Sequence, residues 1–292
     1  MKDFKPMLAQ VYNNHTPIDW GQPVYMQPKL DGVRCVFTKD GAFSRTGKRF
    51  MNVRHIEFEL QDLFKDKPHL ILDGELYNHD LKNDFEKIIS LVRKQTPTHE
   101  DRLEAFNMIQ YHVYDYTGVP ELCEVDASFI SGGKNGLKYK GRQDNLTCSD
   151  IYCPSIRYTE TKRVVTPAMI KVLHQEFLDK GYEGSIIRLN GQYEQKRSKN
   201  LLKVKDFSDS EAKIIDYAEG KGKRKGTIGK FIAVDSHGIQ FGMPVMDNFK
   251  YLQENFGKMK KWIGRTATFK YFEKTKRGSY RHPLFKCLIK FE

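Results

Sequence analysis

"YMQPKLDGVRCVF", residues 25–37, places charged side chains between two apolar segments. The apolar segments are typical of two short β-strands. Lys29, Asp31, Gly32 and Arg34 lie at their ends or between them. Either these are ordinary surface charges on a turn, or the lysine is held there to react. The other segments of the chain help to distinguish the two interpretations.

Four further segments also carry charged residues at the ends of strand-like sequence. They are "SRTGK" (44–48), "LDGELY" (72–77), "EGSIIR" (183–188) and "LLKVK" (201–205). Each segment alone is compatible with a turn or an exposed strand face. Together they contain the groups that bind a nucleotide, namely acceptors for sugar hydroxyls and cations for phosphates.

Within this set Lys29 is the candidate nucleophile, and Glu75 and Glu183 are carboxylates able to bind a ribose hydroxyl or a divalent metal. Tyr114, in "YHVYDY" (111–116), is an aromatic side chain able to stack on a base. Positive charge for a phosphate chain comes from Arg34, Arg45, Arg188, Arg197, Lys203 and Lys205.

Lys203 and Lys205 are two residues apart, so in a strand they face the same side. A lysine with an ordinary pKa of about 10.4 is protonated at neutral pH and cannot attack phosphorus. Neighbouring cations lower the pKa of a lysine. We therefore expect cationic side chains close to Lys29, where they favour the neutral amine.

The net charge of the chain is +12, and it is unevenly distributed. Residues 209–292 contain 18 Lys and Arg against 9 Asp and Glu, whereas residues 1–208 contain 31 against 28. A region this basic suits a polyanion such as nucleic acid. The plain alternative is charge that serves only solubility. Five cysteines without paired spacing argue against a disulfide framework.

The first 208 residues alternate between strand-like and helix-like segments, which predicts a mixed α+β domain. Thr166 and Pro167 are a good N-cap and first residue for one helix, and Gly181 ends it. A polar linker is predicted at 206–210, followed by about five short strands and a helix at 247–257, which fits an oligonucleotide-binding (OB) barrel. Earlier strands are predicted at 24–27, 33–38, 70–73, 110–116, 184–189 and 201–205, and helices at 54–64, 84–94 and 167–180.

In this order, "KLDGVR", "SRTGK", "LDGEL", "EGSIIR" and "LLKVK" resemble motifs I, Ia, III, IV and V of the covalent nucleotidyltransferases. This superfamily contains DNA ligases, RNA ligases and mRNA capping enzymes. "KPMLAQ" (5–10) resembles the start of an ATP-dependent DNA ligase adenylation domain. The segment from "GRTATFKYF" (264–272) onward is similar to the end of the OB domain in the smallest virus-encoded DNA ligases. The resemblance covers nearly the whole chain and points to a compact ligase of the viral or phage type.

The resemblance implies an α+β fold in two domains. Residues 1–208 would form an ATP-grasp-like nucleotidyltransferase (adenylation) domain with antiparallel sheets and flanking helices. Residues 209–292 would form a β-barrel OB-fold domain that binds DNA.

The implied activity is that of an ATP-dependent DNA ligase sealing nicks in duplex DNA. A lysyl-AMP intermediate forms, AMP passes to the 5′-phosphate, and the 3′-hydroxyl attacks. ATP and Mg²⁺ or Mn²⁺ are the expected cofactors, and nicked double-stranded DNA is the expected partner. We expect a monomer in the cytoplasm, or the host cytoplasm for a viral enzyme. No membrane partner is expected, because the chain has no apolar run of about 18 residues and no secretory signal.

By the same resemblance, Lys29 attacks the α-phosphate of ATP. Arg34 and Glu75 contact the ribose. Tyr114 stacks on adenine, where the family more often has phenylalanine. The remaining assignments are Gln27, Arg197, Lys203 and Lys205 to the nucleotide, Glu183 to the metal and Arg45 to the 5′-phosphate of the nick.

The basic run "GKGKRKG" (220–226) lies where relatives carry a longer, DNA-encircling insertion. Its three glycines disfavour a stable helix, so we expect a mobile loop between the first two OB strands. Lys290 is a second departure, since the small ligases tend to have arginine there. In the loop, the side chains expected to bind DNA phosphates are Lys221, Lys223, Arg224 and Lys225.

Two alternatives stay open. An RNA ligase or a capping guanylyltransferase shares the fold, but capping enzymes usually carry threonine where this chain has Leu30. An RNA ligase is not expected to have this OB tail. A non-catalytic nucleic-acid-binding protein would use the same charges only to contact phosphates, and the complete motif set around Lys29 argues against it.

Overall fold

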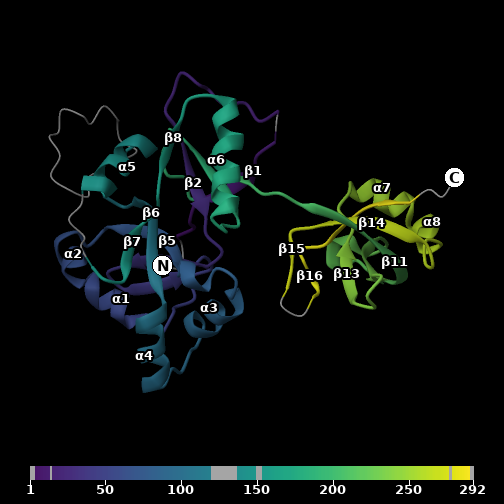
Figure 1. Ribbon diagram of the computed structural model, residues 1–292, viewed down its shortest axis with the longest axis horizontal. Coiled ribbons are helices and arrows are strands. Elements are labelled where there is room, and N and C mark those ends of the chain that lie inside the picture. The colour runs from purple at the N-terminus through teal and green to yellow at the C-terminus, as the bar shows by residue number, and fades with distance from the viewer. Residues whose placement is uncertain (1–3, 14, 120–136, 149–152, 276–277, 290–292) are drawn as a thin grey trace. The chain divides into compact units, whose positions relative to one another are not determined.

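The computed structural model describes residues 4–13, 15–119, 137–148, 153–275 and 278–289 of the chain, and Lys290 lies outside these ranges. The chain divides into two compact units, Met1–Val204 and Lys205–Glu292 (Figure 1). This division falls four residues before the predicted boundary at 208. The predicted linker at 206–210 is wrong in its second part, because a strand begins at Ser208 and pairs there with Tyr271.

Two five-stranded sheets form the first unit, in the strand orders β1-β10-β9-β2-β8 and β4-β3-β5-β6-β7 (Figure 1). Neighbouring strands are antiparallel except β1–β10 and β6–β7, so the prediction of antiparallel sheets is wrong for these two pairs. The strands are β1 (Leu8–Val11), β2 (Val24–Lys29), β3 (Val33–Thr38), β4 (Gly41–Ser44), β5 (Ile71–Tyr77), β6 (Gln110–Thr117), β7 (Ile156–Tyr158), β8 (Lys162–Val164), β9 (Gly184–Leu189) and β10 (Arg197–Val204).

Helices cover the two sheets of this unit. The predicted helix at 54–64 divides at Leu60 into two short helices, whereas the helix predicted at 167–180 is confirmed. Its N-cap Thr166 accepts a hydrogen bond from the backbone N–H of Met169 at 3.4 Å. Gly181 follows with φ +84°. The helices are α1 (Arg54–Glu59), α2 (Gln61–Asp66), η1 (His79–Leu81), α3 (Phe85–Val92), α4 (His99–Met108), α5 (Tyr139–Cys148) and α6 (Pro167–Asp179).

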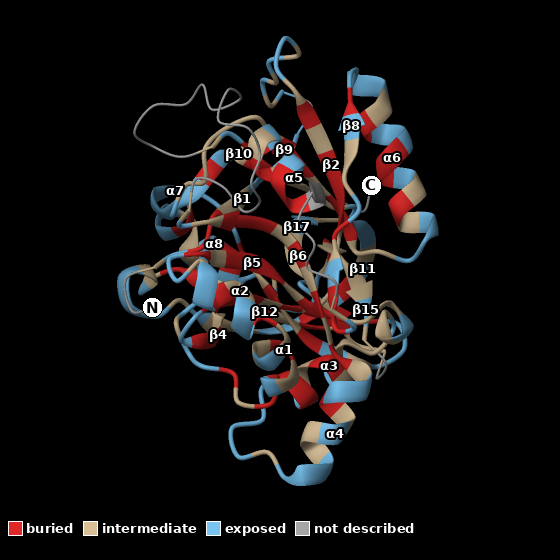
Figure 2. Ribbon diagram, turned by 90° about the vertical axis from the view of Figure 1, so that its left-hand side faces the viewer, coloured by how far each residue is buried: buried red, intermediate tan, exposed pale blue. Residues whose placement is uncertain are grey.

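Each sheet has its own apolar core. α6 packs Ile170, Leu173 and Phe177 against the sheet that contains β2 and β9. Figure 2 shows this helix with a buried stripe on one side and an exposed stripe on the other. Residues of α1 to α4 pack around the sheet that contains β3 and β5.

The segment "KLDGVR" carries the chain from one sheet to the other. Lys29 is the last residue of β2 and Val33 is the first residue of β3. Gly32 is required at this crossing, because a Cβ there would lie 2.4 Å from the carbonyl oxygen of Leu76. The fold therefore places Lys29 where the two sheets meet.

The second unit contains one five-stranded sheet in the order β13-β12-β11-β14-β17 and a two-stranded sheet of β15 and β16. The predicted helix at 247–257 divides at Asn255 and extends to Lys260. The elements are β11 (Ser208–Glu219), η3 (Gly222–Arg224), β12 (Ile228–Val234), β13 (Gln240–Pro244), α7 (Phe249–Glu254), α8 (Phe256–Lys260), β14 (Thr266–Tyr271), β15 (Glu273–Lys274), β16 (Tyr280–Arg281) and β17 (Leu284–Leu288).

The sheet of the second unit is curled but open. Its edge strands β13 and β17 approach within 8 Å at Cα. No hydrogen-bonded strand pair joins them in the part of the chain that the structure describes. The number of main strands agrees with the sequence prediction, while the closed barrel is not observed.

The basic run at 220–226 connects β11 and β12, as predicted, and hydrogen bonds hold a turn within it. Gly222–Arg224 form the single 3₁₀ turn η3. The N–H of Gly226 donates to Oε1 of Glu219 at 2.7 Å, and the Thr227 hydroxyl donates to the carbonyl of Arg224 at 2.7 Å. Gly222 and Gly226, with φ +58° and +82°, supply the positive φ angles of this turn.

Candidate active site

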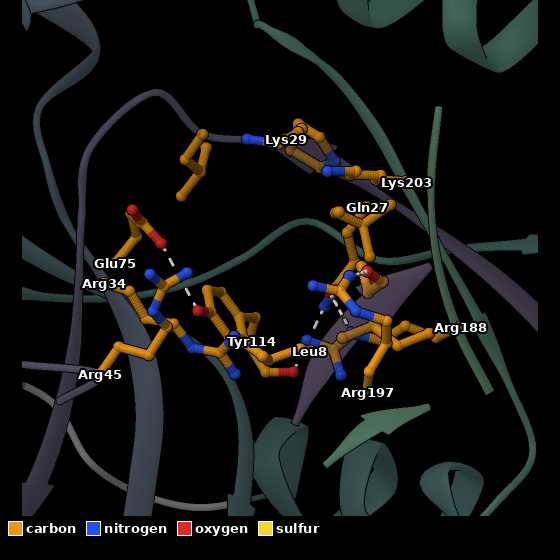
Figure 3. A pocket seen from close by; sticks show the side chains of 15 residues that line it. Leu8, Gln27, Lys29, Arg34, Arg45, Glu75, Tyr114, Arg188, Arg197 and Lys203 are labelled. Atoms are coloured by element: carbon orange, nitrogen blue, oxygen red, sulfur yellow. Dashed lines mark hydrogen bonds between the residues drawn. The ribbon is translucent and has the colours of Figure 1, made fainter. Parts of the chain in front are cut away.

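A cavity of about 280 Å³ opens in the first unit where the two sheets meet (Figure 3). Lys29 and Lys203 line it from one sheet, and Arg34, Glu75 and Tyr114 line it from the other. The residues named from the sequence that line this cavity are Gln27, Lys29, Arg34, Arg45, Glu75, Tyr114, Arg188, Arg197 and Lys203.

The amine of Lys29 forms an ion pair with the carboxylate of Glu183. Strand register brings the two together, because Lys29 pairs with Gly184 between β2 and β9. The N–H of Glu183 also donates to the carbonyl of Lys29 at 3.1 Å. Gly184 has φ +149°, and a Cβ there would lie 2.4 Å from the carbonyl oxygen of Val204. This close approach explains the glycine of "EGSIIR".

Cationic side chains also surround Lys29, as expected. Burial lowers the pKa of Lys203, and the charges of Lys29 and Arg197 lower it further. Arg197 donates to the carbonyl of Ala9. The direct partner of Lys29 is nevertheless Glu183, a carboxylate that was expected from the sequence to bind a ribose hydroxyl or a metal and not Lys29.

Glu75 lies inside β5 and not at the end of a strand, because β5 continues to Tyr77. Burial is the main cause that raises the pKa of Glu75 to about 8, opposed by the charges of Lys29 and Arg34. The hydroxyl of Tyr114 donates to Oε2 of Glu75 at 3.4 Å. Glu75 therefore holds a proton at neutral pH and can donate a hydrogen bond as well as accept one.

Replacing Glu75 by glutamine should change how stability depends on pH. The pKa of Glu75 is about 8 when folded, against 4.5 for an unperturbed glutamate, so the folded protein binds this proton more tightly. The unfolding free energy of the wild type should therefore fall as pH rises from 5 to 8, by up to about 1.4 kcal/mol per pH unit from this group. The unfolding free energy of Glu75→Gln should fall less over the same pH range. Urea unfolding of both proteins at pH 5, 6.5 and 8 measures the difference, and parallel profiles would contradict it.

Arg34 is held by a buried carboxylate. Its Nε and Nη2 donate to the two oxygens of Asp73 at 2.9 and 2.5 Å. The hydroxyl of Tyr193 donates to the same carboxylate at 2.6 Å. Arg34 lines the cavity from this fixed position, opposite Glu75 in the pairing of β3 with β5.

Asp115 is fully buried and joins two arginines. It pairs with Arg142 at 2.6 Å and with Arg188 at 2.8 Å. Arg188 also donates to Oε1 of Gln27 at 2.5 Å, and the Gln27 amide donates to the Thr161 hydroxyl at 2.8 Å. Arg188, grouped from the sequence with the phosphate-binding cations, is thus ion-paired inside the protein, and this network fixes the Gln27 side chain.

Apolar side chains also line the cavity, among them Leu8, Ile186 and Leu201. This apolar lining was not predicted from the sequence. The spacing in the sequence could have indicated this lining, since Ile186 stands two residues before Arg188 and Leu201 stands two residues before Lys203. Residues two apart in a strand share a face.

Lys205 does not line the cavity. β10 ends at Val204, so the prediction that Lys203 and Lys205 share one strand face is wrong. The Lys205 ammonium lies 4.4 Å from the centroid of the Phe272 ring in the second unit.

Carboxylates that could serve a metal are few at this site. Within the described ranges, no three His, Cys, Asp or Glu side chains are grouped to hold a metal ion. Glu183 lies against Lys29, and its charge also acts on Glu75.

Within the described ranges, no helix has both the length and the apolar character needed to cross a bilayer.

The DNA ligase of African swine fever virus is 29% identical to this chain over 237 residues, covering 76% of this chain and 52% of the viral protein. The DNA ligase of Haemophilus influenzae is 26% identical over 233 residues, covering 80% and 75%. The chain spans about half the length of the viral relatives that it matches.

A solved structure from a study of DNA binding by Lig E DNA ligases with a minimal scaffold matches with a TM-score of 0.73 and 21% identity. The match covers 98% of this chain and 99% of that one, and it shows a shared fold. The family model of the ATP-dependent DNA ligase domain matches residues 6–205. Because this model covers most of the chain and every residue that lines the cavity, the chain belongs to the ATP-dependent DNA ligase domain family.

Proposed function

We propose that the protein is an ATP-dependent DNA ligase that seals nicks in duplex DNA through a lysyl-AMP intermediate. The observation that supports this best is Lys29, whose side chain is 23% exposed in a cavity lined by arginines and a second lysine. The curled sheet of the second unit would act as an OB-fold DNA-binding domain, with residues 1–208 as the adenylation domain. The protein would act as a monomer in the cytoplasm, or in the host cytoplasm if it is viral.

The first step joins the Lys29 amine to the α-phosphorus of ATP and releases pyrophosphate. Arg197 and Lys203, which line the cavity, would bind phosphate oxygens, where positive charge stabilises the charge that develops in the transition state. The AMP then passes to the 5′-phosphate of the nick, bound by Arg45. The 3′-hydroxyl finally displaces AMP and closes the strand.

The nucleoside would be bound by both sheets. Tyr114 would stack on adenine, and Gln27 in its fixed orientation would lie beside the base. Arg34 and Glu75 would contact the ribose. A protonated Glu75 suits this role because it can donate to one hydroxyl oxygen while it accepts from another.

Glu183 would bind Mg²⁺ or Mn²⁺ together with the phosphates of ATP. Mg²⁺ commonly uses one or two carboxylates plus substrate phosphates, so a site without a larger acidic cluster suits it. The ion, when bound, would neutralise charge on the phosphates. Glu183 would then exchange its contact with Lys29 for the metal.

The proposal is tested by incubating the protein with α-labelled ATP or GTP and resolving the products on a denaturing gel. Label from ATP and sealing of a nicked DNA duplex are expected. Label from GTP alone would indicate a capping guanylyltransferase, and no label would indicate a binding protein. Nicks with RNA on either side distinguish an RNA ligase.

Glu183→Ala should reduce the rate of lysyl-AMP formation more than tenfold, because a contact to a catalytic metal is worth several kcal/mol. Glu176→Ala is the matched control. It removes an acidic side chain of α6, which pairs with Lys162 of β8 and with Lys180 and does not line the cavity. Rates measured across a Mg²⁺ titration test the role, and a wild-type rate for Glu183→Ala at every concentration would show that the glutamate is structural.

The turn at 220–226 is proposed to bind DNA phosphates through Lys221, Lys223 and Lys225, which are exposed. Arg224 is assigned with them, but it also donates to the carbonyl of Val245 at 3.4 Å, so the test leaves it in place. Replacing the three lysines by alanine should flatten the slope of log K against log salt for nicked duplex by roughly 2 to 3 units. An unchanged slope would leave other basic residues to bind the duplex.

A further inference from the structure

One tyrosine hydroxyl connects the two sheets of the first unit beside the cavity. Tyr193 lies in the segment between β9 and β10, whereas Asp73 belongs to β5 of the other sheet. The hydroxyl donates to Oδ2 of Asp73 at 2.6 Å and accepts from the backbone N–H of Met7 at 3.2 Å. Asp73 and Met7 are both buried. The hydroxyl therefore uses its one proton and an oxygen lone pair at the same time.

Two further contacts hold the ring of Tyr193. Phe4 stacks on it with 6.1 Å between the ring centroids, and the guanidinium of Arg142 lies 5.8 Å from its centroid. Burial, followed by the charge of Asp73, raises the pKa of Tyr193 well above its usual range. The hydroxyl therefore keeps its proton at neutral pH and remains a donor to Asp73.

The two partners of this hydroxyl lead to different walls of the cavity. Asp73 binds Arg34 through both of its carboxylate oxygens. Met7 directly precedes Leu8, the first residue of β1, whose N–H donates to the carbonyl of Lys196 at 2.9 Å. Leu8 and Arg34 both line the cavity (Figure 3). One hydroxyl is therefore bonded to the supports of both side chains.

We propose that Tyr193 is a positioning residue for nucleotide binding, which fixes the guanidinium of Arg34 relative to the Leu8 wall of the cavity. The inference rests on the proposed function, in which ATP occupies this cavity. Tyr193 itself does not line the cavity. It acts on the nucleotide only through the two side chains whose supports it joins.

Loss of the hydroxyl affects both walls. The carboxylate of Asp73 loses a charge-assisted hydrogen bond, so it can turn together with Arg34. The buried N–H of Met7 loses its acceptor, which disfavours the present position of the segment before β1. A ligand that contacts both walls then binds more weakly, because the walls are no longer held in the arrangement that it requires.

Tyr193→Phe is the test, because it keeps the ring and removes only the hydroxyl. Tyr77→Phe is the matched control. The buried Tyr77 also forms a hydrogen bond through its hydroxyl, with Nδ1 of His79 at 2.8 Å, but it does not line the cavity. Calorimetry measures binding of α,β-methylene ATP, an analogue that cannot transfer AMP to a lysine. The KM for ATP and the single-turnover rate of lysyl-AMP formation are measured separately.

Tyr193→Phe should bind the analogue about fivefold more weakly than wild type, with a similar rise in the KM for ATP, since a charge-assisted hydrogen bond is lost. The rate of lysyl-AMP formation at saturating ATP should stay within about twofold of wild type, because Tyr193 does not contact the reacting atoms. Tyr77→Phe should match wild type in all three measurements. Equal binding by the two variants, or a loss of rate without a loss of affinity, would overturn the inference.

Arg34→Lys tests whether Tyr193 acts through the guanidinium. The lysine keeps the charge but loses the paired contact with both oxygens of Asp73. In this background Tyr193→Phe should weaken analogue binding by less than about twofold, because the effects of coupled residues are not additive. The full loss in this background would overturn the inference.

The two proposals can fail separately. A wild-type protein that binds the analogue but forms no lysyl-AMP would reject the proposed function, whereas the comparison of binding would still decide the role of Tyr193. A wild-type protein that does not bind the analogue would reject both.

Discussion

The Lys29→Ala protein should form no covalent adduct with labelled AMP and should not seal a nick that lacks AMP. The variant keeps the cavity but loses the amine that pairs with Glu183 where the two sheets meet. In the proposed mechanism no neighbouring group replaces it as a nucleophile toward the α-phosphorus, because the other cations at the cavity are proposed to bind phosphate oxygens. The measurement is autoradiography of the denatured protein after incubation with α-labelled ATP.

Lys29→Arg is the matched control, since it keeps the positive charge beside Glu183 and removes only the nucleophilic amine. It should also fail to form the adduct. Both variants should retain some sealing of a nick that already carries AMP on its 5′-phosphate, because that step does not use the amine. An adduct in Lys29→Ala would place the nucleophile elsewhere, with Lys203 as the first lysine to examine by peptide mapping.

Much of the first unit could be predicted from the sequence because its signals are local. The segment "KLDGVR" indicated two strands joined by a tight connection, and β2 and β3 confirm them. The helix α6 was predicted from its cap, its first proline and its terminal glycine. The alternation of residues along a strand could also have predicted the apolar wall of the cavity. It places Ile186 with Arg188 and Leu201 with Lys203 on one cavity wall.

Contacts between distant segments could not be predicted in the same way. The pairing of β1 with β10 joins Leu8 to Arg197, and no local pattern encodes it. The Lys29–Glu183 ion pair depends on the register of β2 against β9, and a slip of β2 by one residue would turn Lys29 to the opposite face. The second unit shows the same limit, because strand number could be predicted and closure of the sheet could not.

Two helices were missed for different reasons. α4 has a capping box of Thr98 and Asp101, a signal that was available in the sequence. α5 has a sequence, "YKGRQDNLTC", without a clear apolar face. In the structure α5 contributes Arg142, which is 3% exposed, to the carboxylate of Asp115. The buried ion pair therefore adds to the apolar contacts of Tyr139 and Leu146, which are also buried, in docking this helix.

The buried carboxylate of Asp115 is expected to contribute strongly to the stability of the first unit. Asp115→Ala should lower the unfolding free energy of the first unit by about 3–5 kcal/mol, because removing one partner leaves an uncompensated buried charge. Here Arg142 and Arg188 are both buried and share this single carboxylate. Urea unfolding followed by tryptophan fluorescence measures the loss. The two tryptophans lie one in each unit, so Trp262→Phe leaves Trp20 as the reporter of the first unit.

Removing one of the two arginines together with Asp115 distinguishes charge from simple loss of packing. The double variant Asp115→Ala, Arg142→Met has one buried guanidinium instead of two, and Arg188 keeps its hydrogen bond to Gln27. Its stability should recover by more than 1 kcal/mol relative to Asp115→Ala, because less unpaired charge is buried. A double variant that is less stable than Asp115→Ala, or a single variant within about 1 kcal/mol of wild type, would show that water or another group neutralises these arginines. The orientation of Gln27 in the cavity would then depend on contacts other than the buried triad of Asp115, Arg142 and Arg188.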